Sequence, residues 1–113
     1  MNQGKHVLVL GAGPAGLNSA KLLAEAGFSI TIVDKDIGGN YCRSGSVLSN
    51  SLLYQSKTFA TCSERMQTVV SNDNCSQVSF DFKKSRKLTE QAVARIKKAL
   101  TDDIENLDMK FVY

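Results

Sequence analysis

A glycine-rich turn, Gly11-Ala12-Gly13-Pro14-Ala15-Gly16, constrains this chain more than any other stretch. Before it, residues 6–10 form a nearly continuous apolar run, which is typical of a parallel strand covered on both faces. Gly27 stands where a left-handed residue would end a helix, and residues 28–33 form a second apolar run. The helix itself is indicated by apolar residues at helical spacing, namely Leu17, Ala20, Leu23 and Ala24. The pattern predicts a strand, a turn, a helix and a second, parallel strand.

The residue types in the turn suit the binding of a dinucleotide. Gly11 permits a sharp turn, Gly13 lets the backbone approach a pyrophosphate with no Cβ in the way, and Gly16 lets helix and strand pack closely. Pro14 suits a first helical turn because its missing N–H would have no intrahelical partner. The helix that starts with Pro14 and Ala15 directs free N–H groups and a partial positive charge at the phosphates.

Asp34 ends the second apolar run, about 20 residues after the last glycine, where an acid accepts hydrogen bonds from the adenosine ribose hydroxyls. A carboxylate there disfavours a 2′-phosphate, which argues against NADP. Strand, turn, helix, helix stop, strand and acid arrive in order, so we interpret this unit as a dinucleotide site. The alternative is a βαβ unit of the same shape whose glycines serve packing only.

The composition excludes several other classes of function. The 113 residues suit one domain, and the net charge of +3 is too small to suggest nucleic acid. We interpret the basic run at 83–87 as a solvated segment ahead of a helix. No stretch is apolar and long enough to cross a membrane, and no signal-peptide pattern is present, so we expect a cytoplasmic protein. Cys42, Cys62 and Cys75 form no metal-binding pattern, so we expect reduced thiols and no metal site.

The rest of the chain predicts two long helices and a third strand. Residues 36–51 are rich in glycine, serine and asparagine and indicate a loop over a ligand or a neighbouring domain. A helix from about Ser49 to Val69 is indicated by one broad face, made of Leu52, Phe59, Ala60, Ser63, Met66 and Val70. Residues 71–74 should end it, and residues 75–87 are interpreted as an extended connection.

A second long amphipathic helix is indicated by Leu88, Ala92, Ile96, Leu100, Ile104 and Leu107. Ser85 or Thr89 would cap its start, and it should end near Asn106. Residues 110–113 predict a third strand. The fold class is therefore α/β, a Rossmann-like FAD- or NAD(P)-binding fold with a partial parallel sheet of about three strands. Such folds normally continue to five or six strands. We therefore interpret residues 1–113 as a single, incomplete domain.

Three segments together carry a resemblance to a known family. They are Val7-Leu8-Val9-Leu10-Gly11-Ala12-Gly13-Pro14-Ala15-Gly16, Val33-Asp34-Lys35 and Ile37-Gly38-Gly39. They resemble the FAD-binding start of the pyridine nucleotide–disulfide oxidoreductases, most closely from Lys5 to Leu53 and again over residues 96–113. The resemblance implies that the three glycines of the turn hold the pyrophosphate and Asp34 the ribose. Lys35 would lie at the adenosine edge, and Gly38, Gly39 and Asn40 at the far phosphate and the flavin.

The same resemblance shows a departure at the chemistry of the family. Its redox-active cysteines would fall at Tyr41 and Ser46, and the lysine of its next helix at Asn50. Cys42 is one position off and has no cysteine five residues later. A tyrosine and a serine cannot form the dithiol relay, because it needs two sulfurs within bonding reach. The family's second flavin motif, nicotinamide domain and interface domain would lie beyond Tyr113. We expect no catalytic residue in this chain and no disulfide reductase activity from it alone.

Three hypotheses follow. The first is the FAD-binding N-terminal portion of a disulfide-oxidoreductase-like flavoprotein without the cysteine pair. The second is a non-catalytic module that binds NAD or an adenine nucleotide, and the third is a shortened relative that binds no ligand. Because three strands and few helices leave apolar surface exposed, we also expect association with a second copy or with the remainder of a longer chain.

Overall fold

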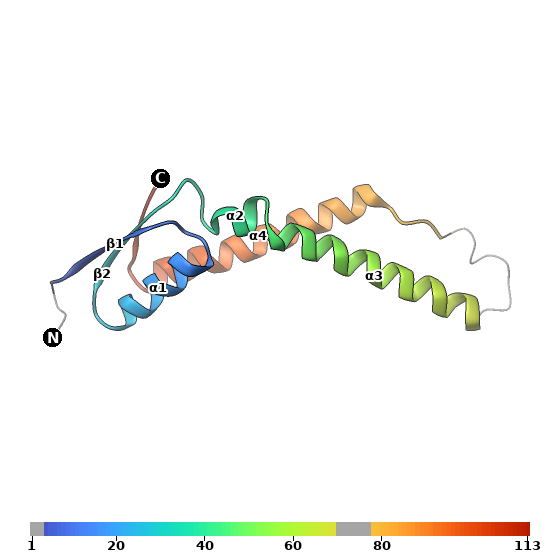
Figure 1. Cartoon of the computed structure of the whole chain (residues 1–113), viewed down its shortest axis with the longest axis horizontal. Helices are drawn as coiled ribbons and strands as arrows, with labels where there is room; N and C mark the ends of the chain where they lie inside the picture. The colour runs from blue at the N-terminus through green and yellow to red at the C-terminus, as the bar shows by residue number, and fades with distance from the viewer. Residues whose placement is uncertain (1–3, 70–77) are drawn as a thin grey trace.

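The protein is an elongated α/β molecule, described here from a computed structural model that covers residues 4–69 and 78–113. Its extents are 70 × 24 × 18 Å. A small sheet packed on helices lies at one end, and two long helices extend from it (Figure 1). The elements in chain order are β1 (His6–Leu10), α1 (Pro14–Glu25), β2 (Ser29–Val33), α2 (Gly39–Arg43), α3 (Ser46–Val69), α4 (Phe82–Asn106) and β3 (Lys110–Val112). The α/β fold class predicted from the sequence is confirmed.

The sheet is parallel, with strand order β1-β2-β3. Val7 pairs with Ile30, and Ile32 pairs in turn with Phe111. Both crossovers therefore step across the sheet in the same direction. Because crossovers between parallel strands are right-handed, this order places their helices on one face of the sheet. Figure 1 shows α1 and α4 on that common side.

The expectation that the first strand is covered on both faces is wrong. Leu8 is 57% exposed and Leu10 is 77% exposed, whereas Val7 and Val9 are half-buried against the core. Successive side chains of a strand point to opposite faces, so Leu8 and Leu10 lie on the face without helices. The one-directional strand order is the physical reason.

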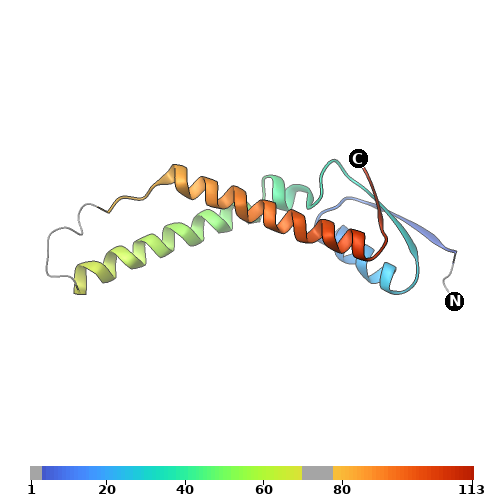
Figure 2. The same ribbon diagram turned by 180° about the vertical axis from the view of Figure 1, so that it is seen from behind.

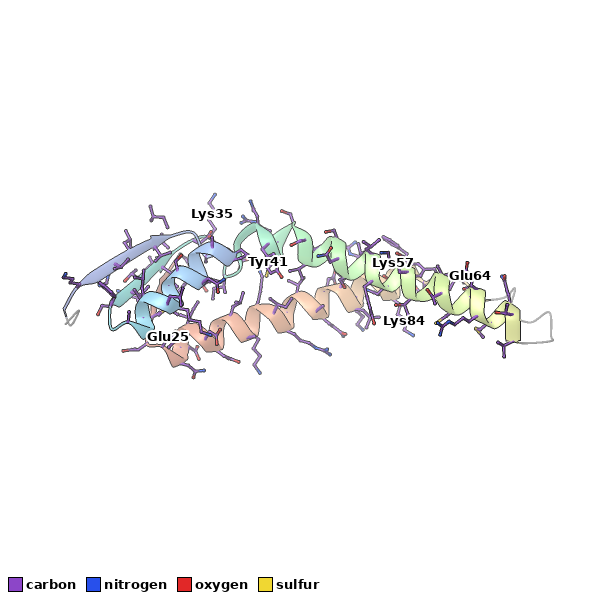
Figure 3. The ribbon with its side chains drawn as sticks, turned by 60° about the horizontal axis from the view of Figure 1, so that its bottom comes forward. Glu25, Lys35, Tyr41, Lys57, Glu64 and Lys84 are labelled. Carbon is purple, nitrogen blue, oxygen red and sulfur yellow. The ribbon has the colours of Figure 1, made fainter. Side chains whose placement is uncertain are left out.

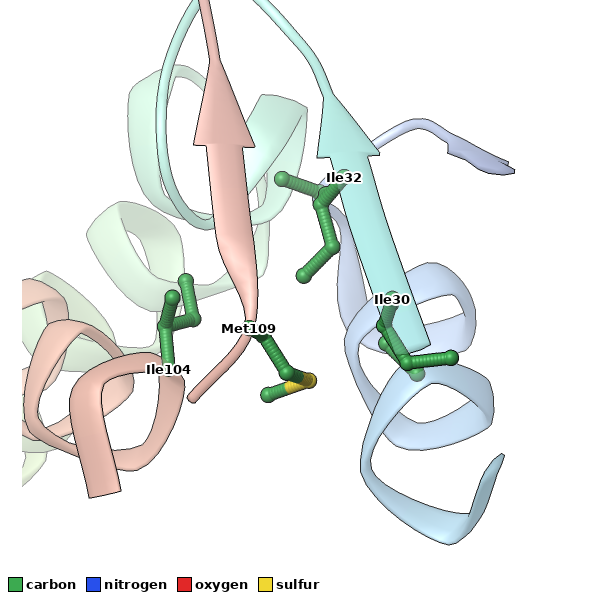
Figure 4. Close-up of a cluster of buried hydrophobic side chains, with 6 residues drawn as sticks. Ile30, Ile32, Ile104 and Met109 are labelled. Atoms are coloured by element: carbon green, nitrogen blue, oxygen red, sulfur yellow. The ribbon is translucent and has the colours of Figure 1, made fainter. Parts of the chain in front are cut away.

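The core lies between the covered face of the sheet, α1 and the last turns of α4. Ile30 and Ile32 of β2 meet Ile104 of α4 and Met109, which precedes β3 (Figure 4). Ala20 of α1 completes the contact and is fully buried. Gly27 ends α1 with φ +87°, as its position predicted.

Two boundaries differ from the sequence expectation. The stretch at 36–51 is not a continuous loop, since it holds the short helix α2 and the first turns of α3, which begins at Ser46. Helix α4 begins at Phe82, inside the expected extended connection. Its cap is neither Ser85 nor Thr89 but Asp81, whose carboxylate accepts the Lys84 N–H at 2.9 Å.

Ser85 and Thr89 instead face α3, where Figure 2 shows the two long helices lying side by side. The Thr89 hydroxyl lies 3.1 Å from the Ser51 hydroxyl and accepts a 3.0 Å hydrogen bond from Gln55 Nε2. The expected helix stop at 71–74, Val70 and Cys75 lie outside the described residues.

Candidate functional site

The glycine turn joins the end of β1 to the start of α1. Gly11 has φ +107°, a left-handed conformation that glycine adopts without strain, and its N–H donates to the Val33 carbonyl at 2.9 Å. A Cβ on Gly16 would lie 1.8 Å from the Gly11 carbonyl oxygen. Gly16 therefore makes the close approach between helix and strand possible.

Gly13 has a different surrounding from Gly16. It is the N-cap of α1, has φ −77°, and a Cβ built on it would meet no atom within 4 Å. The open space borders the first turn of α1, where Ala15 and Gly16 carry N–H groups without intrahelical partners and Pro14 carries none. A pyrophosphate fits this surrounding, because it would meet free N–H groups and the positive end of the helix dipole.

Asp34 lies next to the glycine turn, directly after the end of β2. Its Oδ2 accepts the Ala12 N–H at 2.7 Å and its Oδ1 accepts the Lys35 N–H at 2.6 Å. The pKa of Asp34 is lowered, first by the Ala12 N–H and next by the Lys35 N–H, with a smaller contribution from the Arg43 cation. Asp34 is therefore held as a carboxylate, and each oxygen keeps acceptor capacity for a ribose hydroxyl.

The second glycine pair packs directly on the turn. Gly38 has φ +89°, and its N–H donates to the Ala12 carbonyl at 2.9 Å. A Cβ on Gly39, which has φ +53°, would lie 3.2 Å from Gly13 N and 3.5 Å from Asp34 Oδ2. The structure thus brings Gly13, Asp34 and Gly39 together.

Asn40 and Lys35 lie at the edge of this group. Asn40 is exposed, and its side-chain oxygen accepts a 2.5 Å hydrogen bond from Arg43 Nη2. Lys35 contributes its backbone N–H to Asp34, while its side chain extends outward from the loop (Figure 3). Arg43 is a cation near the site that sequence reasoning missed, because only its place at the end of the unpredicted helix α2 brings it near Asp34.

An apolar pocket of about 390 Å³ opens beside the start of α1. It is lined by Pro14, Leu17, Asn18, Gly38, Tyr41, Ile96 and Leu100. Tyr41, at the position where the family resemblance places a redox cysteine, is 40% exposed. The other two positions of that comparison, Ser46 and Asn50, lie exposed in the first turns of α3.

Two cysteines lie in the described part of the chain, and both are free. Cys42 is 1% exposed, and burial raises the pKa of its thiol. Cys62 is exposed on α3. The described residues hold no group of three or more histidine, cysteine or acidic side chains able to bind a metal. Within residues 4–69 and 78–113, no helix has the length and apolar character that a membrane span requires.

Comparison with known proteins identifies the family to which the chain belongs. The family model described as pyridine nucleotide-disulphide oxidoreductase matches residues 5–110. Dihydrolipoyl dehydrogenase from Acholeplasma laidlawii is 30% identical over 85 residues, which are 74% of this chain and 25% of that protein. An L-amino-acid oxidase from Siganus canaliculatus is 51% identical over 41 residues, which are 34% of this chain and 8% of the oxidase.

Solved structures show the same fold. LpdA from Mycobacterium tuberculosis matches with a TM-score of 0.77 at 17% identity, over 96% of this chain and 23% of that one. The HOCl-induced flavoprotein disulfide reductase RclA from Escherichia coli matches with a TM-score of 0.67 at 14% identity, over 96% and 21%. The chain spans a quarter or less of the length of these relatives. From the family match over residues 5–110, the chain belongs to the pyridine nucleotide-disulphide oxidoreductase family.

Proposed function

We propose that this chain is the FAD-binding portion of a disulfide-oxidoreductase-like flavoprotein that lacks the usual redox cysteine pair. The observation that carries the proposal is the meeting of Gly13, Gly39 and Asp34 at the start of α1. The two glycines leave backbone without side chains beside free helical N–H groups, and Asp34 provides a fixed carboxylate. These features suit a pyrophosphate and the adjoining ribose.

We assign the site residues to different parts of the ligand. Gly11, Gly13, Pro14, Ala15 and Gly16 hold the pyrophosphate, Asp34 binds the ribose hydroxyls, and Lys35 lies at the adenosine edge. Gly38, Gly39 and Asn40 lie at the far phosphate, and the apolar pocket beside Pro14 and Tyr41 offers a place for an apolar ring. Flavin is preferred because one structural relative is itself described as a flavoprotein. When bound, FAD would supply the redox chemistry.

No thiol–disulfide step is proposed for this chain. The buried Cys42 and the exposed Cys62 are the free thiols of the described residues. Tyr41 and Ser46 carry hydroxyl groups that cannot exchange with a disulfide. NADH-dependent reduction of lipoamide or glutathione disulfide by the purified chain would contradict this part of the proposal.

A second candidate is a non-catalytic module that binds NAD or an adenine nucleotide. One observation favours it. The residues whose surroundings best suit a ligand, Gly13 and Asp34, would contact only the adenosine and pyrophosphate that FAD and NAD share. In this reading the pocket beside Pro14 contributes nothing to affinity.

Titration of the purified chain with FAD, NAD, ADP-ribose and NADP, followed by fluorescence or calorimetry, separates the candidates. FAD binding tighter than ADP-ribose binding supports the flavoprotein. Equal affinity for FAD, NAD and ADP-ribose supports the adenine-nucleotide module. Absence of saturable binding of all four ligands would overturn both candidates and leave the ligand-free relative. NADP should bind more weakly than NAD, because its 2′-phosphate would approach the Asp34 carboxylate.

A further inference from the structure

An ion pair joins α4 to the loop that carries the second glycine pair. Lys97 Nζ donates to Asp36 Oδ2, and the two residues are 61 positions apart in the sequence. Their side chains are 32% and 35% exposed. The pair is therefore about two-thirds buried, so water and salt screen its attraction less than that of an exposed surface pair.

Asp36 lies between the proposed ribose acid and the glycine pair, and its main chain shapes the same loop. The Asp36 carbonyl accepts the Gly39 N–H at 3.2 Å, while the Gly38 N–H reaches the Ala12 carbonyl at 2.9 Å. A shift of Asp36 would therefore move Gly39. Gly39 has little freedom to move inward, because even a methyl group on it would lie 3.2 Å from Gly13 N.

A second contact, between Cys42 and Gly38, also supports the loop. Cys42 is buried under Gly38, where a Cβ on Gly38 would lie 2.5 Å from Cys42 Sγ. Cys42 therefore packs directly against Gly38, while the Lys97 ammonium ties the same loop to α4. Burial is the main cause of the raised pKa of the Cys42 thiol, and both charges of the pair also act on it, the Lys97 cation lowering the pKa and the Asp36 carboxylate raising it.

We propose that Asp36 and Lys97 are positioning residues for the dinucleotide site. They hold Gly38 and Gly39 against Gly13 before the ligand arrives, so that binding does not have to order this loop. Neither residue is assigned a contact with the ligand. The inference rests on the proposed function, because its purpose is the arrangement of that pyrophosphate site.

A positioning role predicts a larger effect on affinity than on stability. Ordering a loop at the moment of binding opposes association directly. We expect Lys97→Met to weaken FAD binding roughly tenfold, which corresponds to about 1.4 kcal/mol. Asp36→Ala should weaken it to a similar extent. The double variant should be no weaker than either single variant, because both substitutions remove the same contact.

Lys98→Met is the matched control, since it removes the same charge from the next, exposed position of α4. FAD affinity is measured by fluorescence titration of all five proteins, with the unfolding midpoint recorded for each. Unchanged FAD affinity in Lys97→Met would overturn the proposal. Equal weakening in Lys98→Met would also overturn it, because the effect would then be one of net charge.

Amide hydrogen exchange separates this proposal from the proposed function. In Lys97→Met the Gly38 and Gly39 amides should exchange faster, while the Gly11 amide, bonded to the Val33 carbonyl, should keep its protection. If the unaltered chain binds no dinucleotide, the proposed function fails. The exchange measurement then tests by itself whether the ion pair holds Gly38 and Gly39 in place. Unchanged exchange at Gly38 and Gly39 would overturn the positioning role whatever the ligand.

Discussion

Gly16 faces the carbonyl of Gly11 so closely that a Cβ at position 16 would lie 1.8 Å from the oxygen. This oxygen belongs to the backbone, so no side-chain rotation relieves the clash. Gly16→Ala should therefore destabilise the fold by about 3 kcal/mol, at the upper end of overpacking effects. Gly13→Ala, whose new methyl group meets no atom within 4 Å, should change the free energy of unfolding by about 1 kcal/mol or less. Urea denaturation of the two variants tests the contrast, and equal losses of stability would contradict it.

Asp34 should make the free energy of unfolding of the chain depend on pH in the acidic range. The pKa of Asp34 is lowered in the folded protein, chiefly by the Ala12 and Lys35 N–H groups. Its stabilising effect is therefore fully present above the unfolded pKa of about 3.9 and is lost as the pH falls through the lower folded value. Urea unfolding between pH 6 and pH 3 should show a loss that Asp34→Asn reduces. Identical pH dependence in both proteins would contradict the assignment.

The thiols of Cys42 and Cys62 should react at different rates. Burial raises the pKa of Cys42 and also blocks access to it, whereas Cys62 is exposed on α3. Since the thiolate is the reactive form, alkylation at pH 7 should modify Cys62 well before Cys42. Mass spectrometry of the two peptides after timed iodoacetamide treatment measures this order. Faster modification of Cys42 would show that its thiol is not buried as the structure describes.

The uncovered face of the sheet should promote self-association of the isolated chain. Leu8 and Leu10 form apolar surface on the edge strand β1, and edge strands readily pair with other chains. We predict concentration-dependent association in sedimentation experiments. Replacing both leucines by threonine, which keeps β propensity, should reduce it. A matched Leu53→Thr variant on exposed α3 serves as the control. Monomeric behaviour of the unaltered chain at high concentration would contradict this prediction.

The elements between Lys5 and Lys35 could be predicted well because their signals are local. The apolar runs, the glycine turn and Gly27 all act within a few residues, and the structure has β1, α1 and β2 in the expected order and positions along the chain. The start of α4 was missed because Val78, Phe80 and Phe82 alternate as in a strand. In the structure Phe82 opens the helix, and Phe80 packs edge-on against Phe59 with ring centroids 5.4 Å apart. That contact is tertiary, and periodicity carries no information about it.

The candidate site could be predicted only in part, for a similar reason. The spacing of Gly13 and Asp34 along the sequence predicts that they lie close together, because the βαβ unit has a fixed geometry. The contact between Gly39 and Gly13 depends on the path of a loop, and the pair between Asp36 and Lys97 joins residues 61 positions apart. Nothing local in either segment indicates its partner. The bare face of β1 follows from strand order, which the sequence pattern does not specify.

Binding of FAD to the unaltered chain and to Gly13→Ala tests the central claim most directly. The added methyl group would occupy the space that we propose for the pyrophosphate, while the fold has room for it. We predict saturable FAD binding by the unaltered chain and binding at least about tenfold weaker in Gly13→Ala, a difference of about 1.4 kcal/mol, with both proteins equally folded. Equal FAD affinity in the two proteins would contradict the assignment of the pyrophosphate site.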